Sequence, residues 1–260
     1  MPAAGRAYDP AMGERTSYAP GTLSWTELLT SDADAAKAFY TEVFGWSYDD
    51  RPIGEGMVYS MAQRDGKSVA ALYQSQDPPH WNCYVTVASV EDTVEAARGL
   101  GAQILAEPFD VMTAGRSAAI ADPTGAVLYL WEPGDNIGAY LVNQPGAMAW
   151  NDLVTAKPDA AADFYGALFG WTVEEIPHAG GYRSIKNGER TNGGIMPLDG
   201  PSAWMPYFGH ESVDSVIERI EGLGGKLMTG PMPVPSGQFA VFIDPQGAVF
   251  GVLESNAYDD

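Results

Sequence analysis

Two acidic residues, Glu27 and Asp152, stand at matching positions in segments that the sequence pattern predicts as β-strands. Each follows a tryptophan by two positions, Trp25 in one segment and Trp150 in the other. Because residues two apart on a strand share a face, each carboxylate points to the same side of its strand as the indole ring. Burial among rings raises the pKa of a carboxyl group toward values that suit proton transfer. The pattern therefore predicts Glu27 and Asp152 as catalytic residues.

Further aromatic and polar side chains fall on the same predicted faces as the two carboxylates. Flat aromatic walls with a few hydrogen-bonding groups are typical of sites for planar or apolar small molecules, such as an aromatic natural product or antibiotic. The alternative is that these rings only fill the core. The two carboxylates, which are costly to bury without a purpose, favour a binding site. The predicted ligand-binding residues are Trp25, Asn82, Tyr84 and Tyr129 in the first half of the chain and Trp150, Met205 and Tyr207 in the second.

An internal repeat sets the arrangement of these residues along the chain. The segment 23–46 is matched by 148–171, at a distance of 125 residues. Later matches, such as Trp81 with Trp204, are 123 residues apart, and loop-length differences between two copies of one domain produce small ordered changes of this kind. The sequence predicts an N-terminal tail (1–22), a first domain (23–135), a linker (136–147) and a second domain (148–256).

Within each copy the pattern is a strand, a helix and several short strands, used twice. In the first copy we expect a helix that is capped by Ser31 or Asp32 and ends at Gly45. Its apolar face carries Ala35, Ala36, Phe39, Tyr40 and Val43. A second helix is expected over 91–100, and strands over 25–30, 58–62, 69–73, 82–87, 117–121 and 126–131. The chain is thus predicted to be an α+β protein, a tandem duplication of four β-α-β-β-β modules.

The charge of the chain argues against two classes of partner. There are 14 Lys and Arg residues against 34 Asp and Glu, which gives a net charge of −20. Such a surface repels phosphate backbones and anionic lipid headgroups, so we expect no nucleic-acid and no membrane partner. Cys83 is the single cysteine and can form no internal disulfide, and no apolar run is long enough for a signal peptide or a membrane helix. A cytoplasmic protein is the expectation.

The tandem modules resemble those of the vicinal oxygen chelate superfamily, which includes glyoxalase I, bleomycin resistance proteins and extradiol dioxygenases. The resemblance rests on the motif FY…FGW at 39–46 and on the Asp-Pro-Thr-Gly turn at 122–125, and it extends over 23–254. More narrowly, the chain is similar to a double-length bacterial subgroup of glyoxalase-like proteins. The resemblance implies two cupped mixed sheets with the helices outside. It also implies a divalent metal ion held in a cup by His, Glu or Gln side chains.

The positions that correspond to those metal ligands carry other residue types. They fall on Trp25, Asn82 and Tyr129 in the first copy and on Trp150, Met205 and Gly251 in the second. Indole, thioether and hydrogen offer no lone pair that suits a hard or borderline divalent ion. The three histidines, His80, His178 and His210, do not align between the copies. We therefore expect no metal ion and no other cofactor.

The function that these residues favour is the binding of a hydrophobic or aromatic small molecule, either to sequester it or to transform it by metal-independent proton transfer of the lyase or isomerase type. In the second case Glu27 or Asp152 is the general base, and Tyr84, Tyr129 or Asn82 polarises a carbonyl group or holds an enolate. Two alternatives stay open: a metal-dependent glyoxalase or extradiol-type dioxygenase with relocated ligands, and a protein-interaction module. Either a monomer or a homodimer is compatible with two copies in one chain.

Overall fold

The computed structural model describes residues 13–54 and 56–255, so residues 1–12 of the expected tail and residue 256 of the expected second domain lie outside the described residues. In the first copy the elements are β1 (Leu23–Thr30), α1 (Ala33–Phe44), β2 (Ser47–Gly54), β3 (Met57–Arg64), β4 (Lys67–Gln74), β5 (His80–Thr86), α2 (Val90–Gly99), β6 (Gln103–Val111), β7 (Gly115–Ala121) and β8 (Val127–Pro133). In the second copy they are β9 (Met148–Thr155), α3 (Pro158–Phe169), β10 (Thr172–Glu175), β11 (Arg183–Asn187), β12 (Arg190–Pro197), β13 (Ala203–Gly209), α4 (Val213–Gly222), β14 (Lys226–Val234), β15 (Gly237–Ile243) and β16 (Val249–Ser255). This order confirms the β-α-β-β-β module and its fourfold use.

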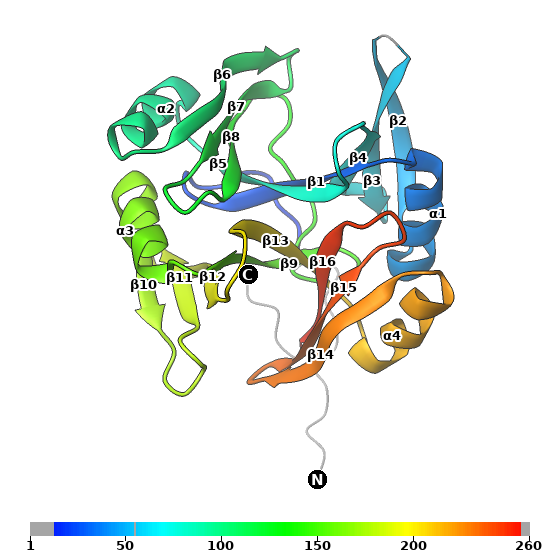
Figure 1. Cartoon of the computed structure of the whole chain (residues 1–260). Coiled ribbons are helices and arrows are strands. Elements are labelled where there is room, and N and C mark those ends of the chain that lie inside the picture. Colours follow the sequence, from blue (N-terminus) through cyan, green and yellow to red (C-terminus); the bar gives the residue numbers. More distant parts are fainter. Residues whose placement is uncertain (1–12, 55, 256–260) are drawn as a thin grey trace.

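Each copy forms one mixed sheet of eight strands, in the orders β2-β3-β4-β1-β5-β8-β7-β6 and β10-β11-β12-β9-β13-β16-β15-β14. β1 pairs antiparallel with β5 and parallel with β4. The first strands of the two modules therefore lie side by side at the centre of the sheet. Both sheets curl into cups, and the helices lie at their outer sides (Figure 1). The predicted α+β fold with two cupped mixed sheets is confirmed.

Sequence analysis did not locate the outermost strands. β2 and β6 form the two edges of the first sheet, and β2 is exposed along almost its whole length. An edge strand has a neighbour on one side only, so it needs few buried apolar residues. The alternation of apolar and polar residues that marks a half-buried strand is therefore missing from the sequence of these strands. These edges widen the cup, but they carry none of the predicted site residues.

Helix α1 begins and ends as its sequence predicts. The Asp32 carboxylate accepts a hydrogen bond from the Ala35 amide at 3.0 Å, and Gly45 ends the helix in the left-handed conformation with φ of 70°. Four of the five residues expected on its apolar face are buried. The fifth, Ala35, is exposed; this expectation was wrong because the buried stripe is centred near Ala36 and Val43, and Ala35 lies at its edge. No helix in the described part of the chain is long and apolar enough to cross a membrane.

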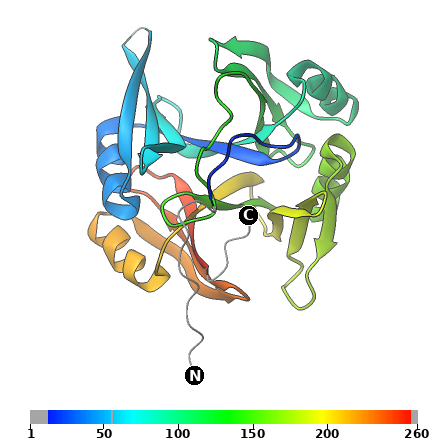
Figure 2. The same cartoon turned by 180° about the vertical axis from the view of Figure 1, so that it is seen from behind.

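The two sheets pack against each other through the faces opposite their cups, and the two larger hydrophobic core clusters are shared between the copies. Helix α1 lies beside α4, and α2 lies beside α3 (Figure 1; Figure 2). One core cluster combines α1 with Phe208 of β13 and Phe250 of β16. The other combines α2 with Phe164 and Tyr165 of α3. Helices of one copy thus cover strands of the other, a feature that the repeat alone did not reveal.

A buried tyrosine of each copy contacts a turn of the other copy. The Tyr40 hydroxyl in α1 donates to Asp244 Oδ2 at 3.0 Å. Asp244 Oδ1 accepts the backbone amides of the residues that close the Asp-Pro-x-Gly turn of the second copy. The matching Tyr165 lies beside Asp122, and the charge of Asp122 adds to burial in raising the pKa of that phenol. The FY motif and the turn motif therefore meet across the two copies and join them into one body.

The segment expected as a linker is part of the packed structure. Ala139 and Leu141 are buried in the core, and the Trp46 indole donates to the Gly146 carbonyl oxygen at 2.7 Å. The described part of the expected tail is bound as well, because the Gly21 amide donates to a carbonyl at the end of β5 at 2.8 Å. Both segments therefore help to position β1, the strand that carries Glu27.

Candidate functional site

The Glu27 carboxylate lies in the first cup at the centre of a hydrogen-bond network, with only 6% of its surface exposed. Its Oε1 accepts the Tyr84 hydroxyl at 2.6 Å and the Asn82 amide at 3.3 Å. Its Oε2 accepts the Tyr59 hydroxyl at 2.8 Å. The Trp25 indole N–H donates to the Tyr59 hydroxyl at 3.2 Å. The direct partners of the carboxylate are all neutral, so hydrogen bonds rather than ion pairs hold it.

Strand pairing brings these residues to one face of the sheet. β1 and β5 pair with Trp25 opposite Tyr84 and with Glu27 opposite Asn82. β5 and β8 pair with Tyr84 opposite Tyr129. Residues opposite each other on neighbouring strands place their side chains on the same side. The structure thus gathers all five residues that were predicted for the first cup.

Two further tyrosines of the first cup, Tyr59 on β3 and Tyr73 on β4, were missed by sequence analysis. Their ring centroids are 6.0 Å apart, and those of Tyr84 and Tyr129 are 4.8 Å apart. Two pairs of phenol rings therefore flank Glu27. Tyr73 and Tyr129 are only partly buried, so they form the rim of the cup, where a ligand would meet them first.

Burial raises the pKa of the Glu27 carboxyl group, and the hydrogen bonds from Tyr84, Tyr59 and Asn82 offset part of this rise. The Glu27 charge adds to burial in raising the pKa of Tyr84 well above its usual value. The phenol therefore stays protonated and remains a donor. A carboxyl group with a raised pKa can both take and return a proton nearer neutral pH. The geometry suits general acid–base chemistry.

Glu27→Gln is expected to gain stability relative to the wild type as the pH rises. A carboxyl group with a raised pKa in the folded state makes folding less favourable as the pH increases from its unfolded pKa, about 4.3, through its folded pKa. Glutamine carries no charge, so the free energy of unfolding of Glu27→Gln does not change through this titration. The difference between Glu27→Gln and the wild type should therefore grow over that pH window and then stay constant. Urea unfolding at a series of pH values measures this difference. The control is Glu221→Gln, on the exposed side of α4, whose free energy of unfolding should differ from that of the wild type by the same amount at every pH. A difference for Glu27→Gln that also stays constant with pH would contradict the prediction.

The second cup repeats the arrangement around Asp152, which is 4% exposed. The Trp150 indole and the Tyr182 hydroxyl donate to Asp152 Oδ1 at 2.8 and 2.7 Å. Burial raises the pKa of this carboxyl group against the hydrogen bonds from Tyr182, Trp150 and Tyr207. Met205 stands opposite Asp152, and Tyr207 stands opposite Trp150. The four residues predicted for this cup therefore also share one face.

Tyr182, which directly precedes β11, is the counterpart of Tyr59, and sequence analysis missed it too. Both tyrosines donate to the carboxylate of their own cup. The repeat contained the signal, because Tyr182 follows Tyr59 by 123 residues, the distance that also separates Trp81 from Trp204. Reading the repeat position by position would have found the pair.

Two glycines make room for the tyrosines of the second cup, Tyr182 and Tyr207. The acid of this cup, Asp152, is one methylene group shorter than Glu27. A Cβ atom on Gly194 would overlap the Tyr182 hydroxyl, and one on Gly251 would overlap the Tyr207 ring. The first cup carries Ala71 and Tyr129 at these places. Because Asp152 extends less far into the cup than Glu27, its tyrosine partners must come closer to the strands, and the two glycines leave the space for them. Both copies thus build a buried carboxylate from different donors: two phenols and an amide hold Glu27, and an indole and a phenol hold Asp152.

Gly251→Ala is expected to destabilise the protein by about 1–3 kcal/mol, the usual cost of overpacking a core. The new methyl group would overlap the Tyr207 ring, which is 3% exposed. Urea unfolding measures the change. Gly222→Ala is the control, because no atom lies within 4 Å of a Cβ atom added to this last residue of α4, and alanine gains up to about 1 kcal/mol over glycine in a helix. Equal losses for both variants would contradict the prediction.

Two of the histidines and the cysteine lie outside the two cups. His80, the first residue of β5, is exposed on the same face as Asn82, and its charge lowers the pKa of Glu27. His178 is exposed, and His210 Nδ1 lies 2.9 Å from the Ser212 carbonyl oxygen in the turn after β13. Burial raises the pKa of the Cys83 thiol to about 12, so it is no nucleophile at neutral pH. Within the described residues, no three His, Cys, Asp or Glu side chains gather where they could hold a metal ion.

Comparison with known proteins decides the family. The sequence model of the Glyoxalase/Bleomycin resistance protein/Dioxygenase superfamily matches residues 22–130, which is the first copy. A Mycobacterium tuberculosis protein named "Putative glyoxylase CFP32" is 43% identical over 256 residues, which cover 94% of this chain and 98% of that protein. The chain belongs to this superfamily. The resemblance seen in the sequence motifs is confirmed over nearly the full length.

Other members of the superfamily are more distant in sequence. The anthracycline biosynthesis protein DnrV of Streptomyces peucetius is 30% identical over 271 residues, which cover 92% of this chain and 95% of that protein. The crystal structure of the Mn(II)-bound glyoxalase from Novosphingobium aromaticivorans aligns with a TM-score of 0.66 at 16% identity, over 92% of this chain and 86% of that one. At this identity the structural likeness shows the fold, with its paired and duplicated modules.

Proposed function

We propose that this glyoxalase-like protein binds an aromatic small molecule in its first cup and moves a proton on it through Glu27, without a metal ion. The observation that carries the proposal is a buried carboxylate held by two phenols and an amide. A buried acid with a structural role commonly caps backbone amides, as Asp244 does in its turn. Glu27 instead lies in a cup lined with rings, with neutral donors around it.

The residues at the superfamily's metal positions do not fit a divalent ion. The Trp25 nitrogen carries a hydrogen that it donates to Tyr59, and the Asn82 amide is turned toward Glu27. A neutral phenol such as Tyr129 is a weak ligand for a hard ion, and Met205 and Gly251 of the second cup supply no oxygen or nitrogen. These side chains support a reaction that uses the acid and base groups of the chain itself.

In the proposed step, Glu27 Oε2 takes a proton from a carbon atom next to a carbonyl group of the ligand. This oxygen accepts the Tyr59 hydroxyl, and a carboxylate oxygen has a second lone pair for the proton. The electron pair of the broken C–H bond moves into the carbonyl group, and Tyr129 or Asn82 stabilises the enolate oxygen. Return of the proton to another atom completes an isomerisation. In a lyase reaction the electron pair of the enolate instead forms a C=C bond and expels a leaving group from the neighbouring carbon, and this group departs with the proton from Glu27. No oxidant is required.

The ligand class follows from the walls of the cup. The half-buried rings of Tyr73 and Tyr129 stand on β4 and β8, on either side of the strand pair that carries Glu27. Rings in such positions favour a flat aromatic ligand, with which they can stack. The relative DnrV is named for anthracycline biosynthesis, and anthracyclines are fused-ring aromatic compounds. A fused-ring aromatic carbonyl compound is therefore the ligand that we propose.

Binding of the fused-ring dye quinizarin tests the proposal. We expect its absorption spectrum to shift on addition of the full-length protein, and the shift to persist after treatment with EDTA. Tyr129→Leu should weaken binding by about tenfold through loss of a rim ring. Tyr140→Leu is the control, since its hydroxyl makes only a long 3.3 Å bond at the surface. Binding that EDTA abolishes and Mn(II) restores would contradict the proposal, as would equal binding by both variants.

A further inference from the structure

A histidine stands at the rim of the first cup, close to Glu27. His80 is the first residue of β5 and is exposed, whereas the rest of this strand is buried. β1 and β5 pair with His80 opposite Leu29 and with Asn82 opposite Glu27. Because residues two apart on a strand share a face, His80 lies on the cup face. It is therefore a diagonal neighbour of Glu27 across the strand pair, a separation that long side chains can cover.

A hydrogen bond fixes the imidazole ring and decides which of its nitrogens is free. His80 Nδ1 lies 2.7 Å from the Pro78 carbonyl oxygen. A carbonyl oxygen only accepts, so Nδ1 carries the hydrogen of the neutral ring, and Nε2 keeps its lone pair. Nε2 has no hydrogen-bond partner among the residues that the structure describes. The rim of the first cup therefore carries a fixed acceptor.

The half-buried ring of Tyr73 and the imidazole stand on either side of Leu29. β4 and β1 pair with Tyr73 opposite Leu29, so these three residues form a row across the rim. Two strand spacings, about 10 Å, separate the ends of the row. A flat fused-ring ligand that stacks on Tyr73 and covers Leu29 brings its far edge to the imidazole. The same ligand lies beside Glu27, the next residue of β1 on the cup face.

Electrostatic effects place His80 and the loop before it at the same rim. Burial raises the pKa of the Glu27 carboxyl group, and the charge of His80 is among the influences that lower it. Burial also raises the pKa of the Tyr73 phenol, and the charges of Glu27 and Asp77 add to this rise. Such interactions weaken with distance. The imidazole therefore lies near the groups that a ligand in the first cup would contact.

The geometry points to a ligand that carries a hydroxyl group on the edge of its ring system, with this hydroxyl group donating to His80 Nε2. The inference rests on the proposed function of the first cup and narrows the ligand class to hydroxylated fused-ring carbonyl compounds. An aromatic hydroxyl group is a donor that suits the lone pair of a neutral imidazole. A ligand without a donor at this edge would displace water from Nε2 and leave the nitrogen without a partner.

The second copy has no counterpart of this acceptor. Ala203 stands at the place of His80, because it lies opposite Val154 in the second sheet as His80 lies opposite Leu29 in the first. An alanine side chain has no atom that accepts a hydrogen bond. The preference for a hydroxyl group therefore belongs to the first cup alone.

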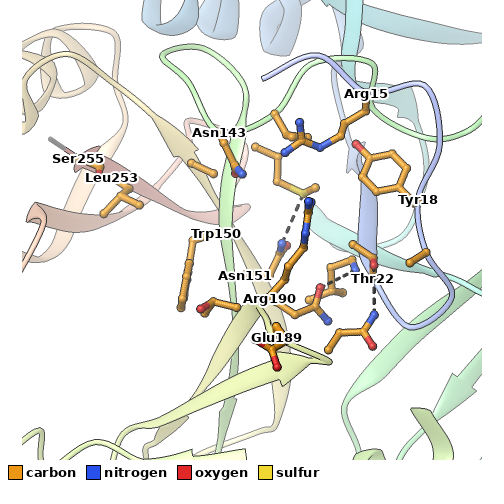
Figure 3. A pocket seen from close by; sticks show the side chains of 18 of the residues that line it. Arg15, Tyr18, Thr22, Asn143, Trp150, Asn151, Glu189, Arg190, Leu253 and Ser255 are labelled. Carbon is orange, nitrogen blue, oxygen red and sulfur yellow. Dashed lines mark hydrogen bonds between the residues drawn. The ribbon is translucent and has the colours of Figure 1, made fainter. Parts of the chain in front are cut away.

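A pocket of about 670 Å³ adjoins the second cup, and Arg15, Trp150 and Arg190 are among the residues that line it (Figure 3). Its volume is in the range of small-molecule sites, so a probe molecule fits there as well. No histidine is among the described residues that line this pocket. A preference that depends on His80 therefore distinguishes binding in the first cup from binding in this pocket.

Calorimetric titration of the full-length protein in mildly alkaline buffer, where a histidine is neutral, tests the inference with two matched probes. One is an α-tetralone with a hydroxyl group meta to its ketone, and the other is its methyl ether, which has no hydrogen to donate. We expect the wild type to bind the hydroxyl compound about three- to tenfold more tightly, the usual contribution of one hydrogen bond. His80→Ala should abolish this preference by weakening the binding of the hydroxyl compound alone, whereas a purely structural role would weaken both. His178→Ala, which removes an exposed histidine of the second copy, should keep the preference.

Two results would overturn the inference and leave the proposal for the first cup standing. The first is quinizarin binding by a wild type that does not bind the hydroxyl compound, or that binds the two tetralones equally. The second is a preference that His80→Ala retains and Glu27→Gln abolishes, because the hydroxyl group then meets the carboxylate. Failure of quinizarin and both tetralones to bind the wild type would refute the site proposed for the first cup, and the inference with it.

Discussion

Glu27→Gln is expected to slow proton exchange on a bound ligand by about 10²–10⁴-fold, the usual contribution of a positioned general base. Glutamine has nearly the same shape and can keep hydrogen bonds to Tyr84 and Tyr59, whose hydroxyls can turn to accept as well as donate. It cannot take up the proton. Binding should therefore stay within a fewfold of the wild type while exchange is lost. Mass spectrometry of an aromatic ketone that is incubated with the protein in heavy water measures the exchange.

The repeat supplies the control for this experiment. Asp152→Asn removes the equivalent charge from the second cup, where Tyr182 and Trp150 donate to the carboxylate. We expect it to leave exchange in the first cup unchanged. If Asp152→Asn abolishes exchange and Glu27→Gln does not, the second cup is the reactive one. If neither variant slows the exchange catalysed by the wild type, the assignment of either carboxylate as the base is wrong.

Phe208→Ala is expected to lower the free energy of unfolding by about 3–5 kcal/mol, the range for truncating a buried phenylalanine. Phe208 belongs to the second copy and is fully buried. Its ring centroid lies 5.1, 5.2 and 5.0 Å from those of Phe44, Trp46 and Trp81, all in the first copy. The cavity would therefore open in a core to which both copies contribute. Urea unfolding, followed by tryptophan fluorescence, measures the loss.

The same experiment tests whether the two copies unfold together. Because the two larger core clusters draw on both copies, we expect one cooperative transition for the wild type, and one transition at lower urea for Phe208→Ala. Phe109→Ala, at a side chain that is 45% exposed, should change stability by less than about 1 kcal/mol. Two separate transitions, or equal losses for the two variants, would contradict a shared core.

Shared packing also explains why the residues that line the two cups can differ. The helices and turns that join the copies, through Tyr40 with Asp244 and Tyr165 beside Asp122, lie on the faces away from the cups. Residues inside the cups can differ between the copies without disturbing this contact. The change from Glu27 to Asp152, and the glycines that accompany it, are differences of this kind.

The sequence by itself determined the repeat, the module and the faces of the central strands. Strand alternation has a period of two, so the placement of Trp25 with Glu27, and of Trp150 with Asp152, followed from their spacing once the strands were located. Buried strands carry this pattern clearly because one face must be apolar. β2 is almost wholly exposed. β6 alternates between exposed and half-buried positions, but its apolar residues Ile104, Leu105 and Ala106 follow one another without alternation, and therefore neither strand was located.

Only the tertiary structure decided which groups meet across the strands and across the copies. Tyr59 on β3 and Tyr182, just before β11, donate to their carboxylates, and no local pattern sets the register of these two strands. The pocket between Arg15 and Arg190 joins parts of the chain that are more than a hundred residues apart. Contacts of this kind depend on how two packed sheets are placed against each other, and that placement comes from the whole shared core rather than from any single segment. The sequence therefore indicated the carboxylates, and the fold supplied their partners.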